Sequence, residues 1–121
     1  MKYALLFFHD ESKFSADELG ALEAEMRSVA DTLVEAGVME GEASGLRLCA
    51  PETATTQALR DGRVMITDGP FSETKECLAG FWLVEAADLE EALAYAKRVP
   101  LARWGWVEVR PSRQCLASPP Q

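Results

Sequence analysis

Residues 3–8 form the uninterrupted apolar run Tyr3-Ala4-Leu5-Leu6-Phe7-Phe8. In an extended strand successive side chains point to opposite faces, so the odd-numbered side chains point one way and the even-numbered ones the other. A strand that is apolar on both faces is normally buried on both faces. The run therefore predicts a central strand whose sheet needs cover on both sides.

A long amphipathic helix is predicted after this strand, over residues 15–36. Ser15 can cap its start, and Glu18 completes a capping box three residues later. Apolar residues then recur at spacings of three and four from Leu19 to Leu33, which places them on one helical face. Gly37 follows at the position where a left-handed residue ends many helices.

A β-hairpin is predicted around Asp61-Gly62, a dipeptide favoured in two-residue hairpin turns. Strands over residues 55–60 and 63–67 flank it. A two-residue turn fixes the register, so Leu59 faces Val64 and Thr55 faces Asp68.

The other elements complete the order β-α-β-(ββ)-β-α-β. A short strand is expected within residues 43–48, a second two-sided apolar strand at 80–84 and a last strand at 104–109. Asp88 caps a second helix, which Pro100 stops. This order indicates an α+β, ferredoxin-like antiparallel sheet with two helices on one face. We expect a second copy to cover the other face, giving a homodimeric sandwich or barrel.

Composition restricts the class of protein further. The 121 residues suit one domain, which we expect over residues 1–111 with a loose tail at 112–121. The net charge of −8, from 12 Lys and Arg against 20 Asp and Glu, argues against direct nucleic-acid binding. No apolar run approaches the roughly 18 residues of a membrane span, and no signal peptide is expected. Three scattered cysteines and one histidine predict no disulfide frame, no metal site and a reducing, cytoplasmic location.

The chain resembles the YCII-related, or DGPF-domain, family. The matching segments are Thr53-Ala54-Thr55-Thr56, Thr67-Asp68-Gly69-Pro70-Phe71-Ser72-Glu73-Thr74-Lys75-Glu76, Ala79-Gly80-Phe81-Trp82-Leu83-Val84 and Val107-Glu108-Val109-Arg110-Pro111. The resemblance implies a dimeric α+β barrel and genes that often lie beside those of alternative sigma factors, but no known reaction. Better-studied relatives carry a proposed His–Asp pair on the side of the first helix. The predicted helix at 15–36 contains no histidine, so this mechanism is in doubt here.

Asp68 and Glu42 are the candidate catalytic residues. The predicted register places Asp68 on the same hairpin face as Val64 and Ile66, and a carboxyl group at the edge of an apolar surface is a candidate general acid or base. Asp68 can equally serve as a turn residue that accepts backbone N–H bonds before Gly69. Glu42 matches the Gly-Glu of the family at the entry to the second strand and is expected to face the pocket.

A polar loop is expected to form the mouth of this pocket. Its candidate ligand-binding residues, taken with the hydroxyl groups of the preceding strand, are Thr55, Thr56, Gly69, Pro70, Phe71, Glu73, Lys75 and Glu76. A solvated charged loop is the simpler interpretation of the last three. His9-Asp10 could form a proton-transfer pair, but a polar loop entry is the favoured interpretation.

Two functions remain open from the sequence. One is a small-molecule enzyme without a cofactor, in which Asp68 and Glu42 supply acid/base chemistry in a cleft. The other is a non-catalytic module that binds a small ligand or a partner protein, linked to sigma-factor-dependent transcription through gene context alone.

Overall fold

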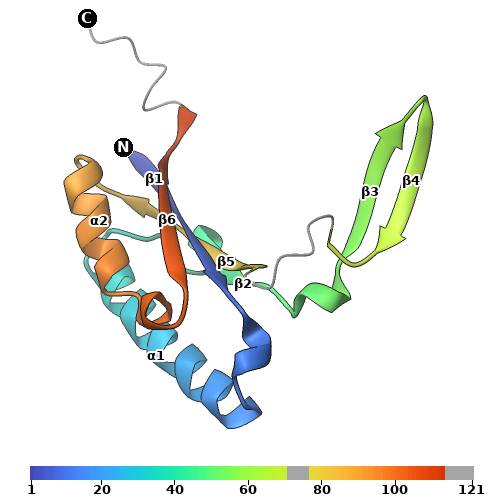
Figure 1. Cartoon of the computed structure of the whole chain (residues 1–121). Helices are drawn as coiled ribbons and strands as arrows, with labels where there is room; N and C mark the ends of the chain where they lie inside the picture. The colour runs from blue at the N-terminus through green and yellow to red at the C-terminus, as the bar shows by residue number, and fades with distance from the viewer. Residues whose placement is uncertain (71–76, 114–121) are drawn as a thin grey trace, which may run out of the picture.

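The computed structural model describes residues 1–70 and 77–113, and of residues 42, 43, 102 and 103 only the backbone (Figure 1). Four strands form the main antiparallel sheet in the order β2-β5-β1-β6. Their bounds are Lys2–His9 for β1, Gly45–Arg47 for β2, Cys77–Glu85 for β5 and Trp106–Pro111 for β6. The helices α1 (Ala16–Glu35) and α2 (Leu89–Lys97) lie on one side of this sheet. The α+β ferredoxin-like class predicted from the sequence is confirmed.

Local signals set both ends of α1. The Ser15 hydroxyl accepts the Glu18 amide at 3.1 Å, and the Glu18 carboxylate accepts the Ser15 amide at 2.9 Å, so the capping box is present. Gly37 adopts a φ of 77° beyond the C-cap, and the Val38 amide donates to the Leu33 carbonyl at 2.9 Å. This pair of features is a Schellman motif, which satisfies carbonyls that the helix itself leaves open.

The core lies between the helices and one face of the sheet. Tyr3, Leu5 and Phe7 are buried on this face of β1, where Leu5 pairs with Trp82 of β5. From α1, the residues Leu22, Met26 and Leu33 reach the same core.

The opposite face of the sheet is covered by no part of the chain that the structure describes. We call it the open sheet face; its members include Ala4, Leu6, Phe8, Phe81, Leu83 and Trp106. These side chains are half-buried or exposed, and the rings of Phe8 and Trp106 stack with centroids 5.5 Å apart. In a single chain these apolar side chains therefore remain partly exposed to water. This agrees with the prediction, from strands that are apolar on both faces, that the sheet needs cover on both sides.

The hairpin of β3 (Thr55–Arg60) and β4 (Arg63–Asp68) is a separate two-stranded sheet. The predicted register is confirmed, with Leu59 opposite Val64 and Thr55 opposite Asp68. Asp61 and Gly62 both have positive φ, 51° and 77°, as a type I′ turn requires. Figure 1 shows the hairpin projecting from the body, on the side of the sheet away from the helices.

The last strand begins later than predicted, at Trp106 and not at Trp104. Pro100–Arg103 form a short 3-10 helix, and Trp104 closes it by donating its amide to the Leu101 carbonyl at 3.0 Å. A Cβ on Gly105 would overlap the Phe8 carbonyl oxygen, so only glycine fits at this position. Within the described residues, no helix is long and apolar enough to cross a membrane.

Candidate functional site

A cavity of about 570 Å³ lies between α1 and the edge of the sheet formed by β2 and β5. This volume falls in the range of sites for small organic molecules. The lining comprises Glu23, Met26, Arg27, Ala30, Asp31, Val34, Met39, Gly41, Gly45, Leu46, Arg47 and Trp82. Charged and apolar side chains therefore share one concave surface.

Arg47 is the best-positioned charged group of this cavity. One terminal nitrogen of its guanidinium (Nη1) donates to the Ala79 carbonyl at 2.9 Å, and the other (Nη2) lies 3.5 Å from the Glu23 carboxylate. Its Nε is buried and has no hydrogen-bond partner within the part of the chain that the structure describes. A buried donor without a partner is costly, so the position of Arg47 lowers the stability of the fold.

Two glycines bring β2 close enough to β5 to place Arg47. Gly45 pairs with Trp82, and Arg47 pairs with Gly80. A Cβ on Gly80 would lie 2.5 Å from the Leu46 carbonyl oxygen, and one on Gly45 would overlap the Phe81 carbonyl oxygen. Steric space, and not backbone conformation, therefore requires glycine at both positions.

His9 lies outside this cavity, at the end of β1. It is buried, its ring lies 5.4 Å from that of Phe14, and its Nδ1 has no hydrogen-bond partner among the described residues. Asp10 accepts the Ser12 amide at 3.0 Å and the Ser12 hydroxyl at 2.6 Å, which caps the short 3-10 helix Glu11–Lys13. These contacts favour the polar-turn interpretation of His9-Asp10. A hollow beside His9 measures only about 10 Å³, too small for an organic ligand.

The buried imidazole predicts a loss of stability on acidification. Burial and then the charge of Arg47 hold the pKa of His9 below its ordinary value of 6.5, and Asp10 opposes them in part. Because the unfolded chain takes up this proton first, the stability is present above about pH 6.5 and falls as the pH drops toward the folded-state pKa. We expect His9→Gln to flatten this dependence between about pH 7 and pH 5, measured by urea unfolding. Parallel pH profiles for the two proteins would contradict the assignment.

The structure places Asp68 on the hairpin and not on the cavity wall. Its side chain is exposed at the end of β4, opposite Thr55. The following Gly69 has a φ of 92°, donates to the Ala54 carbonyl at 2.6 Å and accepts the Thr56 hydroxyl at 2.6 Å. Thr56 and Gly69 thus hold the base of the hairpin closed, which agrees with a turn role for this segment.

The remaining predicted site residues are only partly described. Phe71, Glu73, Lys75 and Glu76 lie outside the described residues. The backbone of Glu42 lies in the 3-10 helix Gly41–Ser44. Gly41, just before Glu42, and Gly45, three residues after it, both line the cavity. The backbone position of Glu42 is therefore at the cavity rim.

Sequence reasoning missed the charged residues that line the cavity. Glu23, Arg27 and Asp31 recur at intervals of four on α1, which places them in one row along the helix. This spacing of charged residues was the sequence signal that could have identified the helical wall of the cavity. Nothing local marks Arg47, because its role depends on the pairing of β2 with β5.

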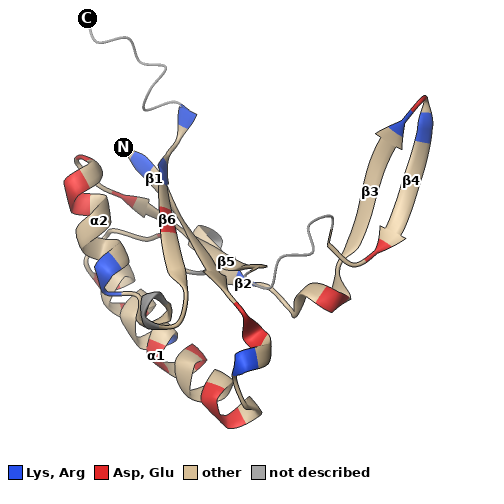
Figure 2. Ribbon diagram, in the orientation of Figure 1, with Lys and Arg blue, Asp and Glu red and all other residues tan. Residues whose placement is uncertain are grey.

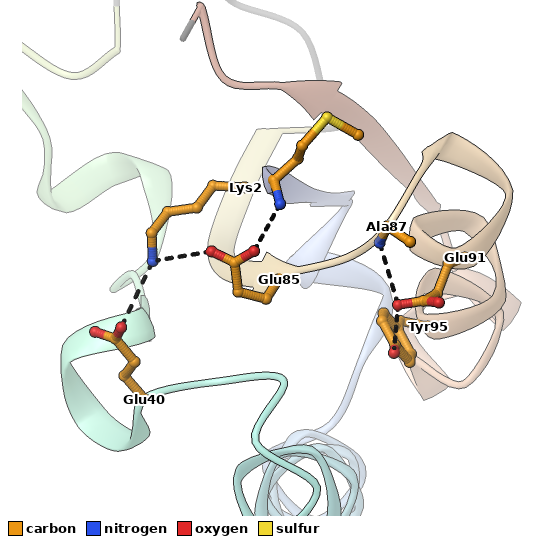
Figure 3. A network of polar contacts seen from close by, with 7 residues as sticks. Lys2, Glu40, Glu85, Ala87, Glu91 and Tyr95 are labelled. Carbon is orange, nitrogen blue, oxygen red and sulfur yellow. Dashed lines mark hydrogen bonds and ion pairs between the residues drawn. The ribbon is translucent and has the colours of Figure 1, made fainter. Parts of the chain in front are cut away.

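A second polar cluster ties the start of β1 to the end of β5 (Figure 3). The N-terminal ammonium group lies 2.7 Å from the Glu85 carboxylate, and Lys2 lies 3.7 Å from Glu40 and 3.9 Å from Glu85. Beside it, the Glu91 carboxylate accepts the Tyr95 hydroxyl at 3.0 Å. Because the ion-paired groups are about half exposed, each pair stabilises the fold weakly. Among the described residues, no group of His, Cys, Asp and Glu is arranged to hold a metal ion.

The fold and the cavity define a small α+β protein with a pocket between its first helix and the edge of its sheet. A family model described as the YCII-related domain matches residues 1–115, so the chain belongs to the YCII-related family. An uncharacterized protein of Rhizobium meliloti (strain 1021) is 39% identical over 116 residues, which cover 92% of this chain and 91% of that protein.

Proposed function

We propose that the chain binds a small organic acid in the cavity between α1 and β2. The observation that carries this proposal is the guanidinium of Arg47, whose side chain is 24% exposed, on the wall of a cavity of about 570 Å³. Arg27 adds a second cation to the same wall. A carboxylate accepts hydrogen bonds from a guanidinium with matching geometry, which makes it the natural anionic group for this site.

The apolar part of the cavity determines the rest of the ligand. Met26, Val34 and Trp82 line it, whereas Glu23 and Asp31 disfavour a second anionic group near them. The ligand class is therefore a monocarboxylate with a short apolar or aromatic body. Within a cytoplasmic homodimer, a second copy would cover the open sheet face and leave the cavity accessible.

Acid/base turnover of this ligand without a cofactor is the enzymatic form of the proposal. Glu42 at the cavity rim is its candidate acid or base, because the other sequence candidate, Asp68, does not line the cavity. Binding without turnover is the alternative, and the exposed position of Asp68 on the hairpin favours it. In that form the bound acid would act as a signal to a partner protein.

The Arg47→Met variant tests the site. We expect the wild-type protein to bind benzoate or hexanoate, and we expect the variant to bind at least about 30-fold more weakly, because a charge-assisted hydrogen bond contributes roughly 2 kcal/mol. Calorimetric titration measures both affinities. Arg113→Met is the matched control, since it removes the same charge after β6, at the opposite edge of the sheet.

The same titration separates the two forms of the proposal. If the site is catalytic, Glu42→Gln should abolish turnover of a bound acid, followed by NMR, and leave its affinity within about threefold, whereas Asp68→Asn, outside the cavity wall, should change neither. Equal binding by the wild-type protein and Arg47→Met, or no binding of any monocarboxylate by the wild-type protein, would contradict the organic-acid site.

A further inference from the structure

The β3–β4 hairpin, residues 55–68, forms an arm that lacks a core of its own. Within the described residues its strands pair only with each other. All six residues of β4 are exposed. An isolated two-stranded hairpin is marginally stable in water at best, so a well-formed arm needs a surface to pack against.

One face of the arm carries three aliphatic side chains beside Gln57, with Thr55 and Asp68 at its base. The register places Leu59, Val64 and Ile66 side by side on this face, with exposed fractions of 66%, 59% and 63%. Arg60, Arg63 and Met65 lie on the other face. Three large adjacent aliphatic side chains with this exposure mark an interaction surface.

The same chain carries a complementary uncovered surface, the open sheet face. Figure 1 shows that the arm leaves the body on that side of the sheet, while both helices occupy the other side. The arm of one chain and the open sheet face of another can therefore meet. A two-fold axis would make the contact reciprocal, so that each copy covers the apolar surface of the other.

Size and charge agree with this arrangement. A strand of six residues is about 20 Å long, and four strands span roughly 14 Å across a sheet, so an arm can cross a partner's sheet. Arg60 lies opposite Arg63 beside the turn residue Asp61, and Figure 2 shows Lys or Arg colour on both strands at this end of the arm. The chain as a whole carries a net charge of −8, so a cationic tip on the partner reduces the repulsion between two copies.

We propose that in the homodimer the arm of each protomer packs against the open sheet face of its partner and buries Leu59, Val64 and Ile66. This inference rests on the proposed dimer but not on the organic-acid site. It also changes the environment of Asp68, which lies with Thr55 on the same arm face. The partner then forms one wall beside this carboxylate, so a site at Asp68 is incomplete in a single chain.

Hydrogen exchange of the wild-type protein is the first test. We expect the amides of residues 56–67 to be protected at protein concentrations that give a dimer by sedimentation, and to lose protection when dilution gives monomers. Protection that does not change with concentration would show that the arm packs on its own chain and would overturn the proposal. A dimer with unprotected arm amides would also overturn it.

Paired substitutions are the second test. The double variant Leu59→Thr and Ile66→Thr keeps β propensity and removes apolar surface, and we expect the dimer dissociation constant to rise at least about 30-fold. Met65→Thr, on the other arm face, is the control and should change it less than about threefold. If the double variant dimerises like the wild type, the proposed arm contact is wrong, although the homodimer itself is supported. If the wild-type protein is a monomer at all concentrations, both the arm contact and the homodimer are wrong.

Discussion

Phe7→Ala is expected to lower the free energy of unfolding by about 3–5 kcal/mol, because it removes a fully buried aromatic ring and leaves a cavity. The ring packs edge-on against Trp82, with centroids 5.1 Å apart and an interplanar angle of 89°. Aromatic pairs of this geometry add to the free energy of burial. Urea unfolding, followed by circular dichroism, measures the loss.

Phe8→Ala is the matched control for this substitution. Phe8 is the next residue, of the same type and in the same strand, but it lies on the open sheet face and is only half-buried. In a single chain, Phe8→Ala should therefore lower the free energy of unfolding clearly less than Phe7→Ala does. Equal costs for the two substitutions at low protein concentration would contradict the assignment of the core to the helix-covered face.

Gly45→Ala is expected to destabilise the protein by about 3 kcal/mol or more and to weaken ligand binding in the cavity. The new methyl group would overlap the Phe81 carbonyl oxygen and lie 2.9 Å from Trp82 Cα, and neither backbone atom can move aside without separating β2 from β5. Separation of these strands displaces Arg47. Thermal unfolding and benzoate titration measure the two effects.

Gly20→Ala provides the control within the same chain. Gly20 lies inside α1, and nothing lies within 4 Å of the place its Cβ would take. Alanine there should stabilise the protein by roughly 0.5–1 kcal/mol through helix propensity. A neutral Gly45→Ala would show that β2 does not approach β5 as closely as the structure indicates.

Features determined by short-range chemistry could be predicted from the sequence. Ser15 and Glu18 define the start of α1 through their own hydrogen bonds, and Asp61-Gly62 sets the hairpin register through positive φ angles. The two-sided apolar pattern of β1 likewise marks it as the strand with neighbours on both edges. None of these predictions requires knowledge of a distant contact.

Features determined by contacts distant in sequence could not be predicted. Arg47 is near Glu23 and Ala79 only because β2 adds to the edge of β5. The separation of the hairpin from the main sheet has the same cause, since its register is the same whether or not it joins a larger sheet. The site prediction therefore centred on Asp68, which has a strong local sequence signal, and missed Arg47, which has none.

The central position of β1 has a consequence for folding during synthesis. β1 is made first, but both strands that pair with it, β5 and β6, lie beyond residue 76. At about 5–20 residues per second, the ribosome needs roughly 5–20 s to supply them. Throughout this interval the run Tyr3–Phe8 lacks both of its neighbouring strands, so we expect it to be prone to aggregation until β5 and β6 have been made.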